Sequence, residues 1–183
     1  MKPILGGVRN VYSSTKSYRV ENPVPLLAWS LAIAASVHIF EEFVFPGGFK
    51  AWWCAYKPGI APSVSNNFLI VINAILIAFS ILVAVAVQVP KGNGIAAWLT
   101  LAALLFSNAI FHIIGAVQTK RYSPGMISGI VLYIPLAVYG FIHFLANGQA
   151  SIGTALIALL LGGSYHFISF ANHRRRAQTA RAK

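Results

Sequence analysis

The 183-residue chain lacks aspartate and has only three acidic residues against 14 lysines and arginines, so its formal net charge is +11 at pH 7. Charged residues make up 9% of the sequence and apolar residues 57%, whereas soluble domains average roughly 25% charged and 45–50% apolar residues. The single cysteine, Cys54, excludes an internal disulfide and any metal or redox site built from cysteines alone. This composition indicates a polytopic membrane protein.

The basic residues lie in the tails and connections that flank long apolar runs. This distribution is typical of topology signals and of contacts with lipid headgroups, so we expect membrane lipids and no nucleic acid as partners. The N-terminal basic region loosely resembles a secretion signal, but it is too long, and the apolar run that follows contains a histidine and two glutamates. We therefore predict an uncleaved first span.

Apolar runs long enough to cross a bilayer as helices recur along the chain, at residues 26–44, 68–89, 95–117, 126–146 and 152–170. They predict an all-α integral membrane bundle of five transmembrane helices. The transmembrane domain, residues 25–172, would lie between a polar basic N-terminal tail, 1–24, and a basic C-terminal tail, 173–183. The aromatic and basic segment 49–57 indicates an interfacial loop after the first span rather than another span.

Local signals refine these boundaries. Ser65 is placed to cap the second span, and Ser123 followed by Pro124 is typical of a helix start. Pro135 lies inside the fourth span, where it removes a backbone donor and predicts a kink. Gly162 and its neighbouring glycine predict a close approach between helices in the fifth span.

With five spans, one side of the membrane carries five lysines and arginines and the other carries nine. The positive-inside rule then predicts an N-terminus outside and a C-terminus in the cytoplasm. The basic C-terminal tail is also expected to contact anionic lipid headgroups.

Two of the three acidic residues, Glu41 and Glu42, lie inside the first span beside His38. At about 100° per residue, Glu41 falls about 60° to one side of His38 and Glu42 about 40° to the other, so one helical face presents all three. Each ionisable group inside a membrane helix costs roughly 2.5–3.5 kcal/mol on insertion scales. Since the predicted spans contain no lysine or arginine, the carboxyls must be protonated, bound to a cation or bonded to histidines.

Antiparallel spans predict which polar residues share the depth of this group. The end of the first span should meet the start of the second, the end of the third and the end of the fifth. The polar residues at those places are Asn73, Asn108, His112 and His166. His143 lies near the end of the fourth span, at the opposite face, and is excluded.

These residues allow several mechanisms. In the first, His38, His112, His166 and either Glu41 or Glu42 supply ligands to a divalent metal ion, which would be zinc or, alternatively, iron or manganese. Asn73 and Asn108 would support the site. His38 and the two glutamates would be catalytic, with whichever glutamate is not a ligand moving protons.

Two alternatives remain open. The histidines and glutamates could transfer protons without a metal, as in an isomerase, or the glutamate pair could carry a proton or cation in a small transporter. Polar residues are sparse in the opposite half of the membrane, where Gln88, His143 and Tyr133 would lie. Transport therefore ranks below catalysis.

The segment 38–42, His-Ile-Phe-Glu-Glu, is followed by Pro-Gly-Gly-Phe at 46–49, by Asn108 and His112 in a later span, and by His166 in the last. In these features the chain resembles the HXXEE-domain family of small polytopic membrane proteins, over most of residues 25–172. The resemblance implies a polytopic membrane fold with an enzymatic site at the motif. The resemblance supports His38, Glu41 and Glu42 as functional positions. From the polar residues themselves we expect a membrane-embedded, metal-assisted enzyme of lipid metabolism, hydrolytic or oxidative, acting on a lipid or other hydrophobic small molecule.

Overall fold

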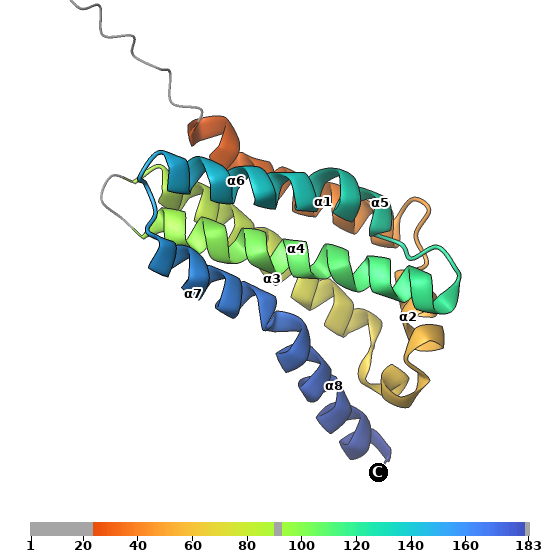
Figure 1. Ribbon diagram of the computed structural model, residues 1–183. Helices are drawn as coiled ribbons and strands as arrows, with labels where there is room; N and C mark the ends of the chain where they lie inside the picture. Colours follow the sequence, from red (N-terminus) through yellow and green to blue (C-terminus); the bar gives the residue numbers. More distant parts are fainter. Residues whose placement is uncertain (1–23, 90–92, 182–183) are drawn as a thin grey trace, which may run out of the picture.

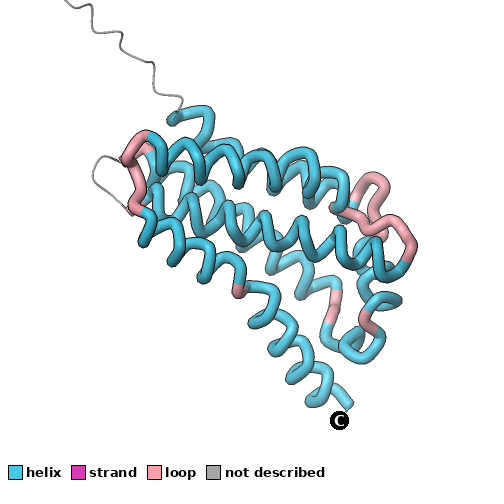
Figure 2. Tube along the Cα trace, viewed as in Figure 1, coloured by secondary structure: helices cyan, strands magenta, loops and turns pink. Residues whose placement is uncertain are grey.

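The computed structural model describes residues 24–89 and 93–181, and within these ranges every regular element is a helix (Figures 1 and 2). The predicted N-terminal tail, except for its last residue, lies outside the described residues. So do residues 90–92 and the last two residues of the chain. The all-α prediction is confirmed.

Within the described residues, five helical segments are long and apolar enough to cross a membrane, which agrees with the predicted number. The fourth and fifth consist of consecutive helices. The segments are α1 (Val24–Phe43), α3 (Asn66–Val87), α4 (Gly94–Thr119), the run of α5 (Met126–Ser128), η2 (Gly129–Tyr133) and α6 (Ile134–Ala146), and the run of α7 (Ile152–Gly163) and α8 (Tyr165–Arg181). The chain is thus a multi-pass membrane protein.

The segment after α1 forms the short helix α2 (Phe49–Tyr56) and the 3₁₀ helix η1 (Pro58–Ser63). Their residues Trp52, Trp53 and Ile60 are buried in an apolar cluster that also contains Leu69 of α3 and Ala177 of α8. The predicted aromatic segment is therefore a folded cap at one end of the bundle, the end where α2 and α5 lie in Figure 1. We refer to this end as the capped end.

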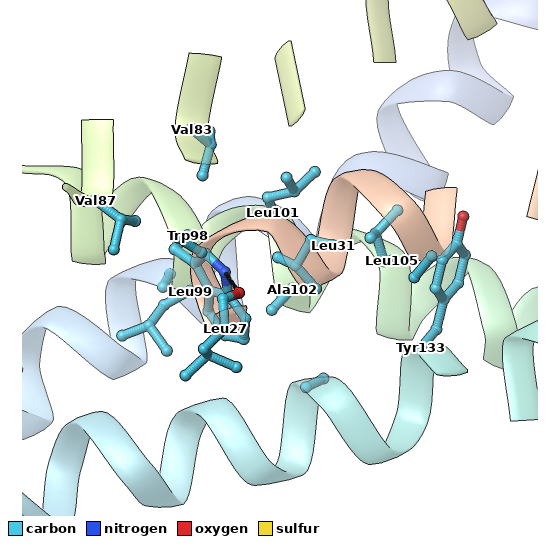
Figure 3. Close-up of a cluster of buried hydrophobic side chains, with 14 of the residues drawn as sticks. Leu27, Leu31, Val83, Val87, Trp98, Leu99, Leu101, Ala102, Leu105 and Tyr133 are labelled. Carbon is cyan, nitrogen blue, oxygen red and sulfur yellow. Dashed lines mark hydrogen bonds between the residues drawn. The ribbon is translucent and has the colours of Figure 1, made fainter. Parts of the chain in front are cut away.

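α4 lies at the centre of the bundle and contacts α1, α3, α6, α7 and α8. Its Trp98 is fully buried, and the indole Nε1 donates to the carbonyl of Leu27 in α1 at 3.0 Å (Figure 3). A Cβ on Gly162 would lie 2.3 Å from the carbonyl oxygen of Thr100. The predicted close approach is thus observed between α7 and α4.

The local signals had mixed outcomes. Ser65 caps α3 as predicted, because its Oγ accepts from the backbone N–H of Phe68 at 3.1 Å. Ahead of Pro135 the chain forms the π-helical turn η2, in which the N–H of Ile134 donates to the carbonyl of Gly129. The predicted kink at Pro135 stays a prediction. The predicted cap at Ser123 was wrong: Gly125, in a left-handed conformation, precedes the first residue of α5.

The fifth segment bends where α7 gives way to α8, and α8 stays helical through Arg181. The described part of the predicted C-terminal tail is therefore helix rather than irregular chain. Its first residue, His173, is buried, and its Nδ1 lies 2.6 Å from the hydroxyl of Ser63 in η1. This contact fastens α8 to the cap.

Candidate metal centre

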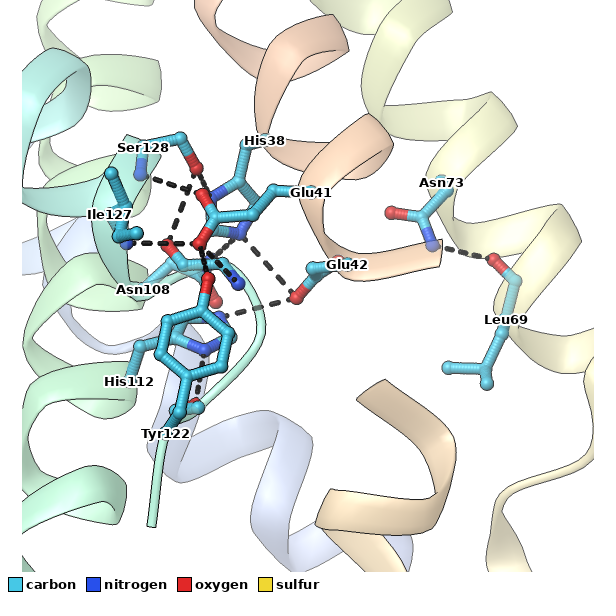
Figure 4. Close-up of polar contacts among 12 residues, drawn as sticks. His38, Glu41, Glu42, Leu69, Asn73, Asn108, His112, Tyr122, Ile127 and Ser128 are labelled. Carbon is cyan, nitrogen blue, oxygen red and sulfur yellow. Dashed lines mark hydrogen bonds and ion pairs between the residues drawn. The ribbon is translucent and has the colours of Figure 1, made fainter. Parts of the chain in front are cut away.

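At the capped end, the last turns of α1 and α4 lie beside the connection that leads from α4 into α5 and η2. Helix α1 supplies His38, Glu41 and Glu42, and α4 supplies Asn108 and His112. The connection spans residues 120–125, so it is short enough to lie directly over the side chains from both helices. Polar groups from these three parts of the chain form one buried cluster (Figure 4).

His38, Glu42 and His112 form its centre. One ligand atom from each lies within 4.8 Å of the others, and the exposed fractions are 2%, 6% and 0%. Glu42 Oε1 is 3.4 Å from the Nε2 of His38 and 3.2 Å from the Nε2 of His112. This buried group could hold a metal ion.

Two serines orient the imidazole rings from behind. The Nδ1 of His38 lies 2.9 Å from the hydroxyl of Ser128, and the Nδ1 of His112 lies 2.8 Å from that of Ser123. The Ser128 hydroxyl itself donates to the carbonyl of Gly125, which leaves its oxygen free to accept the Nδ1 proton of His38. With the protons on Nδ1, both Nε2 lone pairs face Glu42. Such outer contacts are typical of metal-binding histidines.

The two Nε2 atoms have few partners. His112 Nε2 is fully buried, and within the described part of the chain its nearest polar contact is Glu42 at 3.2 Å. His38 Nε2 lies 2.9 Å from the side-chain amide of Asn108, which can donate to it. Asn108, predicted as a supporting residue, thus contacts the centre directly.

Glu41 lies outside the group of His38, Glu42 and His112, and its carboxylate binds the connection and the first residues of α5 (Figure 4). Its Oε1 accepts from the hydroxyl of Tyr122 and from the backbone N–H groups of Gly125 and Ile127, at 3.1 and 3.0 Å. Its Oε2 accepts from the N–H of Ser128 at 2.7 Å. We call this set of four hydrogen bonds the Glu41 clasp.

Tyr122 lies outside the membrane-spanning helices. Burial and the hydrogen bond to Glu41 raise the pKa of its hydroxyl above the ordinary value, so the group remains a donor at neutral pH. The clasp holds the segment that carries Ser123 and Ser128, and through them it acts on His38 and His112.

Gly125 lies against both imidazoles. Its φ is +98°, and a Cβ there would lie 2.7 Å from Cε1 of His38 and 2.9 Å from Cε1 of His112. The left-handed backbone and the lack of a side chain are both required at this position. Gly125 thus lets the connection pass directly over the centre.

A cavity of about 230 Å³ extends from His38 and Glu42 between α3, α4 and α8. His166 lines this cavity but is not part of the group with mutual distances within 4.8 Å. Its ring stacks on Phe111 with the centroids 5.1 Å apart, and its buried Nε2 has no hydrogen-bond partner among residues 24–89 and 93–181. Asn73 also lines the cavity, but its amide donates to the carbonyl of Leu69 in its own helix.

The excluded histidine lies where predicted. His143 is in the last turn of α6, and its carbonyl accepts from the amide of Asn147 at the end of the bundle opposite the cap. Tyr133, counted from the sequence with that opposite half, instead packs its ring on His38 with the centroids 4.5 Å apart. It is fully buried, and none of the residues that the structure describes forms a hydrogen bond with its hydroxyl.

Sequence reasoning thus missed Tyr122, Ser123, Ser128 and Tyr133 as members of the site. The available signal was position, because the third span ends and the fourth begins at the face where the site was predicted. No residue type among them demanded a polar partner as the glutamates did.

A family model described as "Protein of unknown function with HXXEE motif" matches residues 29–140. The matched range contains His38, Glu41, Glu42, Asn108 and His112, together with the whole connection. His166 and the α8 wall of the cavity lie beyond it. No curated protein and no solved structure matches the chain.

Proposed function

The chain belongs to the HXXEE family, and we propose that it is a membrane-embedded enzyme in which His38, Glu42 and His112 hold a divalent metal ion. The observation that carries the proposal is the buried convergence of two imidazoles and one carboxylate within 4.8 Å. Two nitrogen lone pairs and a carboxylate oxygen repel one another at such distances unless a proton or a cation lies among them. Both serine contacts leave the Nε2 atoms free for that role.

Two histidines and one carboxylate suit zinc and, alternatively, iron or manganese. Three protein ligands leave coordination positions open, which is typical of a catalytic site rather than a structural one. Zinc would supply water activated at neutral pH for hydrolysis, whereas iron would supply oxidative chemistry. The adjoining cavity, with its largely apolar lining, supports a hydrophobic small molecule as the substrate.

The two glutamates take different roles in this proposal. Glu42 faces both histidines and is the carboxylate ligand. Glu41 already accepts four hydrogen bonds, so it is a positioning residue rather than a ligand or proton carrier. His166, without a partner for its Nε2, is left for contact with the substrate.

A second candidate is favoured by Asn108, whose amide lies where it can donate to the Nε2 lone pair of His38. With that lone pair engaged, His38, Glu42 and His112 would exchange protons with a substrate without a metal, as in an isomerase. Binding of a metal requires Asn108 to release His38. The two candidates therefore differ in one measurable property, the metal content.

Metal analysis of the full-length protein, purified in detergent and supplied with zinc, iron(II) or manganese, tests the proposal. We expect about one metal ion per chain, as for a specific site. The metal should be lost in His38→Ala, His112→Ala and Glu42→Gln and retained in the matched control His143→Ala, which alters the opposite end of the bundle. Retention in both site-histidine variants would refute the metal site. Absence of stoichiometric metal from the wild-type protein would favour proton transfer.

We also propose that the capped end faces the cytoplasm and that Arg174, Arg175 and Arg176 of α8 contact anionic lipid headgroups there. The imbalance of nine basic residues against five supports this orientation. In a chain whose Cys54 is replaced, Asn147→Cys should react with an impermeant maleimide on intact cells. Gln178→Cys should react only after permeabilisation; the reverse pattern would invert the topology.

A further inference from the structure

The cavity beside the centre changes character along its length. At the capped end it is lined by His38, Glu42 and Asn108. α3 begins and α4 ends at the capped end, so Phe79 lies about 9 Å deeper than Asn73, and Leu104 about 6 Å deeper than Asn108, at 1.5 Å per residue. The α3 and α4 lining beyond the two asparagines is apolar: Ile75, Leu76, Phe79, Leu104 and Leu105.

The deep part of the cavity borders the surface that faces the lipid. Ile75 and Phe79 line the cavity and are also 56% and 44% exposed on the outer face of α3. Both lie in the middle of a membrane-spanning helix. A ligand can therefore reach this part from the hydrocarbon region of the bilayer, where apolar chains are concentrated.

The volume and the lining limit what fits. At about 230 Å³, the cavity exceeds the roughly 150 Å³ of an apolar cavity that binds benzene. Its apolar part lies mainly between α3 and α4, with residues of α8 lining it as well. A single flexible hydrocarbon chain suits this shape better than a two-chain lipid does.

His166 supplies a polar contact that nothing in the described residues satisfies. Its Nε2 is buried, and the stack on Phe111, with the rings only 10° from parallel, fixes the plane of the imidazole. A buried nitrogen without a partner is costly, so we expect one in the working protein. The hydroxyl or carboxyl end of a chain that fills the cavity is such a partner.

We propose that this cavity binds a single-chain lipid that enters from the bilayer between α3 and α8, with its oxygen-bearing end hydrogen-bonded to His166 beside Glu42. The inference rests on the proposed function in taking the end at Glu42 as the reacting end. The hydrocarbon chain lies against Leu76 and Leu104. His166 thereby acts on the substrate rather than on the metal.

Photolabelling in phosphatidylcholine vesicles tests this, with the full-length protein and a palmitic acid analogue that carries a diazirine in its chain. We expect saturable labelling of α3 and α4 near Leu76 and Leu104, displaced by palmitic acid. Leu76→Trp and Ile75→Trp should abolish displaceable labelling by filling the cavity. Ile75→Trp alters an exposed margin, so it remains informative if Leu76→Trp fails to fold. Val138→Trp, on an exposed face of α6, is the matched control.

His166→Phe keeps the stack on Phe111 and removes the nitrogen, so displacement should need about tenfold more palmitic acid while metal content stays unchanged. Unsaturable labelling spread over the outer faces, unaffected by both cavity-filling variants, would overturn the inference. Loss of metal in His166→Phe would overturn the assigned role of His166. Saturable labelling of a protein that binds no metal would refute the proposed metal site while leaving the lipid site standing.

Discussion

The adjacent glutamates should respond in opposite ways to the same substitution. In Glu41→Gln the side-chain oxygen can still face Tyr122, Gly125 and Ile127, but the new NH₂ then faces the N–H of Ser128, whose nitrogen lies 2.7 Å from Glu41 Oε2. Two donors meet there, and the other three bonds lose their charged acceptor. A hydrogen bond to a charged group contributes about 1.5–3 kcal/mol, so we expect a loss of about 2–4 kcal/mol in unfolding free energy.

Glu42→Gln should do the reverse. In the metal-free protein the Glu42 carboxylate faces the Nε2 lone pairs of both histidines, and a glutamine can turn its NH₂ toward one of them, so the free energy of unfolding should not fall by more than about 1 kcal/mol. Metal binding should be lost because a neutral amide replaces the anionic ligand. Both variants replace a glutamate with a glutamine of nearly the same size, and the two substitutions are at adjacent positions.

The measurements are thermal unfolding in detergent after chelation and metal content after reconstitution. For Glu41→Gln, a loss of about 2–4 kcal/mol corresponds to about 4–16 °C in the midpoint on the scale of soluble domains of this length. Metal content should fall less in this variant than in Glu42→Gln. A stable Glu41→Gln protein without metal, beside a Glu42→Gln protein that retains it, would refute the division of roles.

Three further substitutions test other parts of the structure. Gly125→Ala should abolish metal binding, because its Cβ would lie 2.7 Å from the His38 ring at a φ of +98°. The control is Gly148→Ala, which is also at positive φ but has nothing near its Cβ. Equal metal content in both variants would contradict the close contact. Ser128→Ala should weaken metal affinity about 10–100-fold by releasing the Nδ1 of His38. Competition with a chelating dye measures this affinity, and an unchanged value would show that Ser128 does not orient the ring. Trp98→Phe should cost about 1–3 kcal/mol of unfolding free energy, since it removes the bond to Leu27 and leaves space in the core, whereas Trp29→Phe, at a 39% exposed position, should cost much less.

The bundle and the depth of the cluster were predictable because both depend on pattern and topology. Apolar length gave the spans, and antiparallel order placed Asn108 and His112 at the level of His38, where the structure has them in contact. His143 was separated from them by the same rule. These conclusions need only the direction of each helix.

The roles of the residues in the connection were not predictable, because these roles depend on the backbone conformation of the connection. Ser123 before Pro124 is typical of a helix cap, yet the left-handed backbone at Gly125 delays the helix and leaves the serine hydroxyl for His112. The bend between α7 and α8 similarly decides how His166 approaches the cavity. The polar residues near this bend in the sequence do not reveal the direction of the bend. Tyr133 reaches His38 from η2, a turn whose form no pattern predicted.

The motif itself shows why two adjacent glutamates are needed. On one helix, Glu42 at i+4 returns to the face of His38, and its oxygen comes within 3.4 Å of the imidazole. Glu41 at i+3 stands about 100° away from Glu42 around the helix, where it meets the backbone of the incoming α5 instead. One turn of α1 therefore binds the centre with one carboxylate and fastens the segment that orients the centre with the next. Shifting Glu42 by one position would take its carboxylate away from the histidines, and shifting Glu41 by one position would take its carboxylate away from the backbone of α5.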